Sequence, residues 1–328
     1  MRFSLLIGGI ARPRAAGLLL GLVADGVLGD PARWHPVAGF GRYAGWVERH
    51  CYADSRMAGL AYGVLTVGPP VLGAASLAVA VRRYPAAETI AVAAATWAVL
   101  GGTSLGREGA VLADALRADD LVAARARIPH LCARDPAALD AADMARAGCE
   151  SVAENTSDAV VAPLFWGAVA GLPGLLGYRA VNTLDAMVGY RSERYRRFGW
   201  AAARLDDLVN LVPARLTALL TVALAPLVGG SPTAAARAWR RDASGHPSPN
   251  AGPVEASAAG ALGLRLGGPT RYAYGVEQRP VLNPAGSSPA PADLARTVRL
   301  SRLLGWASGG LLAVLAGRWS GAQKRALP

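Results

Sequence analysis

The sequence predicts an all-α protein: a polytopic integral membrane bundle of helices, with three polar inter-span segments that form its active site. Three observations support this prediction. The 328-residue chain is 52% hydrophobic, only 17% of its residues are charged, and its apolar residues gather in long blocks. An ordinary soluble domain carries roughly 25% charged residues, and the mean hydropathy here is +0.27. The composition excludes a disordered chain and disfavours a soluble globular one.

Six apolar blocks are candidate membrane segments. A helix needs about 20 apolar residues to cross roughly 30 Å of hydrocarbon. The blocks cover residues 15–28, 57–81, 89–106, 159–178, 216–228 and 303–317. The longest three, 57–81, 89–106 and 159–178, are the predicted spans, and the others bring the total to at most six. We predict one integral membrane domain over residues 1–328.

The block 159–178 does not fit one straight helix. Pro163 and the Gly-Leu-Pro-Gly run at 171–174 disfavour it, because proline costs about 3 kcal/mol in a helix interior. A re-entrant hairpin at this block would bring the polar segments 107–158 and 179–215 to one side of the membrane. The arginine excess of 179–215 makes that side cytoplasmic by the positive-inside rule.

The third polar segment, 229–302, holds most of the proline and glycine and is expected to be largely loop. The net charge is +11, and Lys324 is the only lysine among 34 basic residues. The arginines lie between apolar blocks and aromatic residues make up 6%, so nucleic-acid binding is not expected. A phosphate-binding loop of the G-x-x-x-x-G-K-[ST] type is excluded because its lysine is missing. The three cysteines are widely spaced and indicate neither a disulfide framework nor a zinc site.

A first polar cluster covers residues 150–158, Glu-Ser-Val-Ala-Glu-Asn-Thr-Ser-Asp. On a helix, Glu150, Glu154 and Asp158 share one face. Like charges at this spacing destabilise a helix unless a positive group neutralises them. A divalent cation such as Mg²⁺ would explain carboxylates gathered at a membrane boundary. The alternative is a solvated helix end with arginine partners from another loop.

A second cluster, at 179–185, repeats the Asn-Thr-x-Asp pattern of residues 155–158 and ends at Asp185. In a helix, Asn182 and Asp185 project the same way. The match involves three letters, so coincidence is the alternative explanation. Two further carboxylates stand before the next apolar block: Asp206 and Asp207.

Four arginines follow within seven residues, at 191, 194, 196 and 197, around Glu193. On a helix, Arg191, Arg194 and Arg197 would share a face while Arg196 points away. The planar guanidinium suits bidentate contacts with phosphate or carboxylate. The alternative is a basic patch that touches anionic lipid.

A third cluster, at 246–252, has the sequence His-Pro-Ser-Pro-Asn-Ala-Gly, and Glu255 follows it. Its prolines and glycine favour a specific turn. His246 is the only histidine of its segment, and a lone histidine is more often structural than catalytic. His35-Pro36-Val37, after Gly29-Asp30-Pro31, forms a similar rigid corner.

Taken together, these motifs resemble the CobD/CbiB family of cobalamin biosynthesis. The resemblance rests on residues 29–31, 35–37, 150–166 (ESVAENTSDAVVAPLFW), 178–199 (YRAVNTLDAMVGYRSERYRRFG) and 246–252. It covers nearly the whole chain in the family's order; residues 253–258 and the tail after 287 match less well. The resemblance implies a multi-pass protein of the cell membrane (the inner or plasma membrane).

The resemblance also implies an activity, that of adenosylcobinamide-phosphate synthase. This enzyme is an acid-amine ligase that joins (R)-1-amino-2-propanol, or its O-phosphate, to a propionate carboxylate of adenosylcobyric acid. ATP and Mg²⁺ drive formation of the amide. Other cobalamin-assembly enzymes are candidate partners, and the lipid bilayer would surround the protein. Because ATP is cytoplasmic, we expect the active site at the cytoplasmic edge of the bundle.

The residues suggest parts for this chemistry. The predicted metal ligands are Glu154, Asp158 and Asp185. The predicted catalytic residues are Glu154, Asn155, Asp206, Asp207, His246 and Asn250, with the base among His246, Asp206 and Asp207. The predicted substrate-binding residues are His35, Asn182, Arg191, Glu193 and Arg194. Two rival functions are a Mg²⁺-dependent membrane enzyme similar to prenyltransferases and a transporter or scaffold without catalysis.

Overall fold

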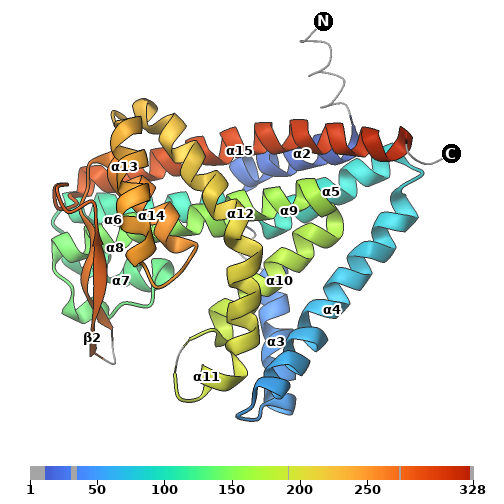
Figure 1. The fold of residues 1–328 in the computed structure, drawn as a ribbon, viewed down its shortest axis with the longest axis horizontal. Coiled ribbons are helices and arrows are strands. Elements are labelled where there is room, and N and C mark those ends of the chain that lie inside the picture. Colours follow the sequence, from blue (N-terminus) through green and yellow to red (C-terminus); the bar gives the residue numbers. More distant parts are fainter. Residues whose placement is uncertain (1–11, 31–34, 191, 273–274, 326–328) are drawn as a thin grey trace, which may run out of the picture. The chain divides into compact units, whose positions relative to one another are not determined.

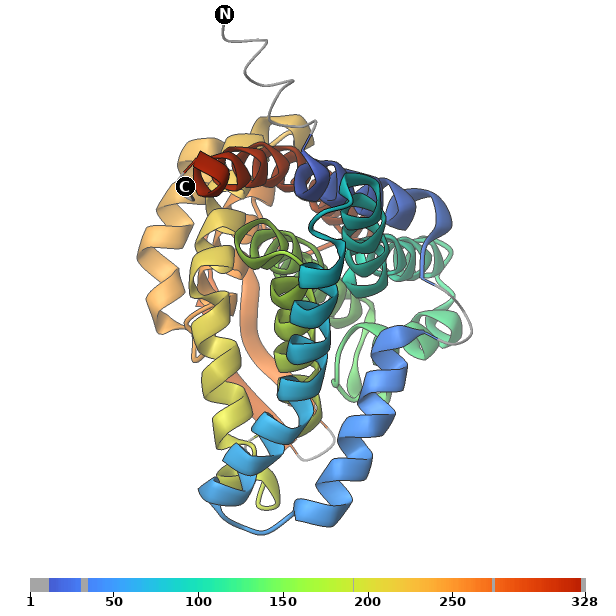
Figure 2. The ribbon, with the colours of Figure 1, turned by 90° about the vertical axis from the view of Figure 1, so that its right-hand side faces the viewer.

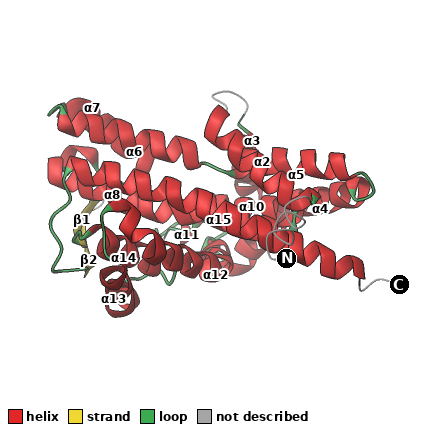
Figure 3. Cartoon of the chain, turned by 90° about the horizontal axis from the view of Figure 1, so that it is seen from above, coloured by secondary structure: helices red, strands yellow, loops and turns green. Residues whose placement is uncertain are grey.

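The computed structural model describes residues 12–30, 35–190, 192–272 and 275–325, and these are mostly helical (Figure 3). Four helical stretches are long and apolar enough to cross a membrane: Arg56–Val81, Pro85–Arg117, Trp200–Val228 and Pro291–Arg318. The prediction of an all-α polytopic membrane protein is therefore confirmed. The predicted blocks 216–228 and 303–317 begin after Arg215 and Arg302, but the helical stretches that contain them begin earlier, at Trp200 and Pro291.

The chain divides into two compact units, each described by itself. The first comprises residues 1–101, 162–210 and 308–328. Its helices are α2 (Pro13–Leu28), α3 (Pro36–Cys51), α4 (Arg56–Val81), α5 (Pro85–Val99), α9 (Ala162–Ala170), α10 (Leu172–Val188), α11 (Tyr195–Phe198) and parts of α12 (Trp200–Leu224) and α15 (Pro291–Arg325). Figures 1 and 2 show α3 and α4 joined at a tight corner. A core that includes Tyr62, Leu184 and Phe198 holds α3, α4, α10 and α11 together.

Two local features of the first unit follow from glycine. Gly17 and Gly21 let α2 pack closely on α5, since a Cβ at Gly21 would lie 2.4 Å from the Cβ of Thr96. Gly171 has φ of +65° and separates α9 from α10. The predicted break in block 159–178 is therefore confirmed.

The second unit comprises residues 102–161 and 211–307. Its elements are α6 (Gly102–Arg117), α7 (Leu121–Leu131), the 3₁₀ turn η1 (Pro136–Ala138), α8 (Ala141–Thr156), the π-helical turn η2 (Ser157–Val161), the end of α12, η3 (Ala225–Val228), α13 (Pro232–Asp242), η4 (Ala243–Gly245), α14 (Ala251–Leu262), β1 (Leu266–Tyr272), β2 (Gly275–Leu282) and the start of α15. All twelve residues of α14 are buried, so it is a central helix of this unit.

The expectation that 229–302 is largely loop is wrong. The segment forms α13, α14, an antiparallel hairpin and the start of α15. Its prolines lie where helices tolerate them, as Pro232 does in the first turn of α13. The hairpin pairs Leu266 with Leu282 and Pro269 with Gln278, and the register shifts between Leu266 and Gly268.

We expect Ser192→Cys and Ser244→Cys to label from opposite faces of the membrane. Both residues are exposed, and the apolar stretch Trp200–Val228 lies between them. Outward-facing apolar side chains on this stretch, such as Leu208 at 63% exposed, are suited to lipid. Impermeant maleimides applied to intact vesicles, in a chain whose three cysteines are replaced, make the measurement. Labelling of both from one face would show that α12 does not cross.

Val122→Cys completes this experiment. Val122 is 79% exposed and belongs to the second unit, as Ser244 does. Hydrogen bonds join residues 140–150 of this unit to its hairpin. We therefore expect Val122→Cys to label from the same face as Ser244→Cys. Segment 162–188 then has to cross the membrane as well. Labelling of Val122→Cys and Ser192→Cys from one face would instead support the re-entrant hairpin.

Candidate active site

A buried ion pair anchors the polar centre of the second unit. Glu150 lies on α8 and is 2% exposed, and Arg134, from the loop after α7, is 6% exposed. The Arg134 guanidinium donates to Oε2 of Glu150. The backbone N–H of Gly267 donates to Oε1 at 2.7 Å. Both carboxylate oxygens of Glu150 therefore have partners, as a buried charge requires.

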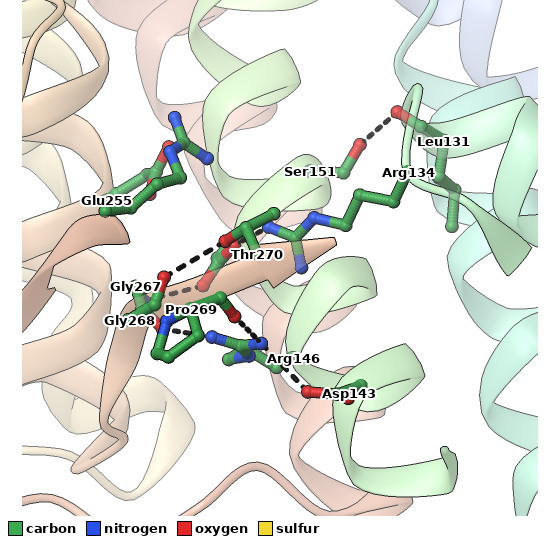
Figure 4. A network of polar contacts seen from close by, with 12 residues as sticks. Leu131, Arg134, Asp143, Arg146, Ser151, Glu255, Gly267, Gly268, Pro269 and Thr270 are labelled. Carbon is green, nitrogen blue, oxygen red and sulfur yellow. Dashed lines mark hydrogen bonds and ion pairs between the residues drawn. The ribbon is translucent and has the colours of Figure 1, made fainter. Parts of the chain in front are cut away.

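Glycine shapes the hairpin at this contact. Gly267 and Gly268 have φ of +76° and +82°, and a Cβ on Gly267 would lie 1.9 Å from the carbonyl oxygen of Pro280. Only glycine fits there, and the resulting bulge brings the Gly267 N–H to α8. Arg146, one turn before Glu150, donates to the Gly267 and Pro269 carbonyls (Figure 4). The hairpin is thus fixed against α8 by backbone contacts.

The central helix α14 contributes a second buried carboxylate. Glu255 is 1% exposed, and its Oε1 has no hydrogen-bond partner among the described residues. Nε2 of His246 lies 3.8 Å from it. Burial raises the pKa of Glu255 well above its usual value, and the charges of Glu154 and Glu150 act in the same direction, whereas Arg279 opposes them. Figure 4 shows Glu255 near the start of the hairpin.

His246 is held neutral beside this carboxylate. Its Nε2 lies 3.0 Å from a guanidinium nitrogen of Arg279 on β2, while Nδ1 lies 3.1 Å from the amide and 3.3 Å from the carbonyl oxygen of Ser248. A neutral imidazole accepts at one nitrogen only, and the charged guanidinium is the stronger donor. We therefore assign the ring proton to Nδ1. Burial, and then Arg279, lower the pKa of His246 to about 4.

Charge does not balance when every group of this cluster is ionised. Three carboxylates, Glu150, Glu154 and Glu255, face two guanidiniums, Arg134 and Arg279. An uncompensated buried charge is strongly disfavoured. Burial also raises the pKa of Glu154, with Glu150 adding to the effect and Arg279 opposing it. The cluster therefore favours either a retained proton or a bound cation, a property typical of functional sites.

The turn before α14 explains the motif at 246–252. Oγ of Ser248 accepts from the backbone amides of Asn250 and Ala251 at 3.2 and 3.1 Å. The side chain of Asn250 accepts from Arg215 of α12 at 3.1 Å. A Cβ at Gly252 would lie 2.4 Å from the Ala243 carbonyl oxygen, so glycine permits close packing. The motif positions His246 at the start of the central helix.

A separate polar network lies in the first unit, between α10 and α12. Asp206 accepts from the side-chain amides of Asn210 at 3.0 Å and Asn182 at 3.4 Å. Tyr178 donates to Asn210 at 2.9 Å, and Arg179 donates to Asn182 at 3.4 Å. The structure thus brings together two predicted site residues, Asn182 and Asp206. Their roles in substrate binding and catalysis remain predictions.

The predicted metal ligands fall in different units. Glu154 and Asp158 belong to the second, and Asp185 belongs to the first. The π-helical turn begins at Ser157, so the regular face shared by Glu150 and Glu154 is interrupted before Asp158. Over the described ranges, no group of three or more His, Cys, Asp or Glu side chains is arranged to hold a metal. Magnesium ligation by this set stays a prediction.

The arginine cluster differs from the predicted helical face. Arg191 lies outside the described residues. α11 has four residues and begins only at Tyr195, after Arg194, so the prediction that Arg194 and Arg197 share a helix face is wrong. Serine, glycine and charged residues precede α11, and the backbone there forms turns. Arg194 donates to Glu48 at 3.0 Å, which gives it a partner within the protein.

The remaining predicted residues have local partners or lie exposed. Nδ1 of His35 accepts from the amide of Val37 at 3.1 Å and so caps α3. Asn155 donates to the Ser151 carbonyl within α8 at 2.9 Å. Asp207 lies 3.7 Å from Arg204. Glu193 is exposed. These contacts show structural roles, and none of them tests a functional role.

Sequence reasoning did not assign four residues of the buried cluster: Arg134, Glu150, Glu255 and Arg279. Glu255 carried a usable signal, because it is the only charged residue in the apolar stretch 251–262. Arg279 carried none, since it stands in a segment expected to be loop.

The low pKa of His246 predicts a pH-dependent stability. An unfolded histidine titrates near pH 6.5, so the folded protein binds this proton only at lower pH. The stability that neutral His246 contributes to the folded protein is therefore fully present above about pH 6.5. As the pH falls toward 4, the free energy of unfolding decreases by about 3 kcal/mol. We expect thermal unfolding in detergent to show this loss in the wild type and a smaller one in His246→Gln. Equal pH slopes in both would contradict the prediction.

Fold and site define a polytopic membrane protein with a buried cluster of carboxylates, guanidiniums and one neutral histidine. The sequence model described as "CobD/Cbib protein" matches residues 18–301, and the chain belongs to the CobD/CbiB family. No solved structure matches the chain.

Relatives support this membership over nearly the full length. The chain is 57% identical over 303 residues to the "Cobalamin biosynthesis protein CobD" of Mycobacterium tuberculosis strain H37Rv, covering 92% of this chain and 95% of that protein. It is 45% identical over 292 residues to the protein of the same name from Chromobacterium violaceum, covering 86% and 90%. The protein of that name from Pelobacter propionicus is 46% identical over 271 residues, covering 80% and 82%.

Proposed function

We propose that this chain acts in cobalamin biosynthesis as adenosylcobinamide-phosphate synthase, an ATP-dependent amide ligase. The observation that carries the proposal is the match to proteins named "Cobalamin biosynthesis protein CobD" along nearly the whole chain. The substrates are adenosylcobyric acid and (R)-1-amino-2-propanol or its O-phosphate. The buried cluster of the second unit supplies chemical groups suited to this reaction.

Amide formation from a carboxylate needs a better leaving group than oxide. In the proposed reaction a carboxylate oxygen of adenosylcobyric acid attacks the γ-phosphorus of ATP, which forms an acyl phosphate and releases ADP. The amine nitrogen then attacks the acyl carbon, the C–O bond to phosphate breaks, and inorganic phosphate leaves. The amine arrives as an ammonium ion and loses two protons in all. The protein has to bind anions and accept a proton.

Arginine supplies the anion-binding groups. Nη1 of Arg134 is buried and has no hydrogen-bond partner among the described residues. Arg279 is half-buried, and its Nη2 lies 3.0 Å from a ring nitrogen of His246. A guanidinium presents several donors in a fixed plane that fits phosphate and carboxylate oxygens. In the proposal these two arginines hold the phosphate and the substrate carboxylate.

Glu255 is the proposed base. It is buried, its Oε1 lacks a hydrogen-bond partner among the described residues, and burial raises its pKa above that of an ordinary carboxylate, which makes it a stronger base. An effective base has a pKa near the working pH. His246, which the sequence suggested for this role, has a pKa of about 4 and binds a proton too weakly. Its proposed task is to hold Arg279 beside Glu255.

Magnesium fits the donor set of the second unit in a limited way. Mg²⁺ takes one or two carboxylates and completes its shell with water and phosphate oxygens. Glu154 and Asp158 are half-buried, and the surplus of carboxylates in the cluster favours a cation. When bound, Mg²⁺ would neutralise charge on the nucleotide phosphates. We propose Glu154 and Asp158 as the protein ligands, and a site on the cytoplasmic side of the cell membrane, which makes the face that labels at Ser244→Cys the cytoplasmic one.

The test is amide formation by the purified protein in detergent. The protein is supplied with adenosylcobyric acid, ATP and Mg²⁺ together with either aminopropanol or its O-phosphate, and mass spectrometry follows the product. We expect the cobinamide or cobinamide-phosphate mass and release of ADP that depends on both other substrates. ATP turnover without the amide, or an amide made without ATP, would contradict the proposed function.

A further inference from the structure

A basic groove lies between α12 and α13, and none of its lining residues belongs to the buried cluster. It is an open groove of about 600 Å³, lined by Val222 of α12 and by residues of α13, among them Arg237, Arg240 and Arg241. This volume is in the range of small-molecule sites, roughly 300–1,000 Å³. The three arginine side chains are exposed. The groove therefore has an apolar side, at Val222, and a positively charged side, at the three arginines.

Two of these arginines have no counter-charge among the residues that the structure describes. Arg241 forms a bidentate pair with Asp242, at 2.7 and 3.0 Å. For Arg237 and Arg240, the described residues provide neither a salt bridge nor a side-chain hydrogen bond. They stand three residues apart on one helix face, where like charges destabilise the helix. An anion in the groove would relieve this repulsion.

The apolar wall places the groove at membrane depth. Val222 belongs to the candidate span Trp200–Val228 and lies six residues, or about 9 Å, before its end. α13 begins at Pro232, just beyond that end, and folds back so that its arginines line the same groove as Val222. Guanidiniums at this depth face the boundary between headgroups and acyl chains. Phospholipid phosphates are the counter-ions available there.

We propose that this groove binds an anionic phospholipid, with its headgroup phosphate on Arg237 and Arg240 and an acyl chain along Val222. Trp239, between the two arginines, is half-buried and of a type enriched at membrane interfaces. The site is independent of the amide-forming reaction, so either proposal can fail without the other. Free phosphate or a nucleotide offers the same chemical group, and the experiment separates these sources.

The experiment measures lipid selectivity in nanodiscs of phosphatidylcholine that contain a trace of spin-labelled lipid. The immobilised fraction of spin-labelled phosphatidylglycerol is compared with that of spin-labelled phosphatidylcholine. We expect the wild type to prefer phosphatidylglycerol. In Arg237→Gln/Arg240→Gln, the selectivity for phosphatidylglycerol over phosphatidylcholine should fall about tenfold. The matched control, Arg265→Gln/Arg271→Gln, removes two exposed charges of the same unit outside the groove and should keep it.

Two further arms identify the source of the phosphate. Arg237→Lys/Arg240→Lys keeps the charge and should retain most of the preference, because attraction to a headgroup depends on charge more than on guanidinium geometry. Inorganic phosphate or ATP, added at matched ionic strength, should not displace the labelled lipid. Displacement by ATP would overturn the proposal in favour of a nucleotide site. Equal immobilisation of the two lipids in the wild type, or equal loss in the control variant, would also overturn it.

Discussion

Glu255→Gln is expected to lower the rate of amide formation by about 10²- to 10⁴-fold, the range that general-base catalysis supplies. Glutamine has nearly the same shape but cannot accept the proton. The fold should be little affected, because glutamine has the shape of glutamate and burial disfavours the charge that the substitution removes. The measurement is turnover at saturating substrates, with thermal unfolding of the same samples as the check on folding.

The control is Glu277→Gln, which removes an exposed carboxylate from β2 of the same unit. It should turn over at nearly the wild-type rate. The pH profile gives a second readout: the wild-type rate should rise as Glu255 loses its proton, and this rise should vanish in Glu255→Gln. A well-folded Glu255→Gln protein that keeps most of its turnover, with the wild-type pH profile, would rule out Glu255 as the base.

The helical membrane architecture follows from composition because hydrocarbon leaves few options for a backbone. Long apolar blocks have to form helices that satisfy their own hydrogen bonds, so 57–81 could be assigned almost to its observed bounds, Arg56–Val81. The break after Ala170 was also readable, since glycine and proline stand there. Helix ends were harder to predict: the charged residues at 204–215 place the start of the predicted block at 216, yet α12 begins at Trp200 and runs through them.

The hairpin and α14 were not predicted, for a physical reason. The high proline and glycine content of residues 229–302 predicts loop. In the structure, however, these residues stand at helix starts, at a helix end such as Gly263, and at the bulge of Gly267. α14 consists largely of alanine and glycine. Its stability comes from burial in the unit, and burial is a tertiary property that the local pattern does not contain.

The candidate site was half predictable. The crowding of carboxylates at 150–158 indicated that something positive had to neutralise them, and an arginine from another loop was one of the two alternatives. For Glu150 that alternative is confirmed by Arg134, although the pair is buried rather than solvated. Its second partner, Gly267, lies 117 residues away. Pairings over such distances depend on the whole fold, and one sequence does not reveal them.

The buried pair predicts the largest effect on stability. Glu150→Gln should destabilise the protein by about 3–5 kcal/mol, because it leaves the guanidinium of Arg134 buried without a compensating charge. The pair's side chains are 3% and 4% exposed, so water provides little screening. Glutamine keeps an oxygen able to accept from the Gly267 amide, so the substitution tests mainly the charge.

A double-mutant cycle separates the pair from its surroundings. Arg134→Gln alone should be about as harmful, since it leaves the Glu150 carboxylate uncompensated. Arg134→Gln/Glu150→Gln removes both charges, and its loss of unfolding free energy should fall well short of the sum of the two single losses. Denaturant unfolding in one detergent, with Arg117→Gln at the exposed Asp114 pair as a control near zero, makes the comparison. Strictly additive losses would show that the two side chains do not stabilise each other, and the neutralisation of α8 by Arg134 would then be wrong.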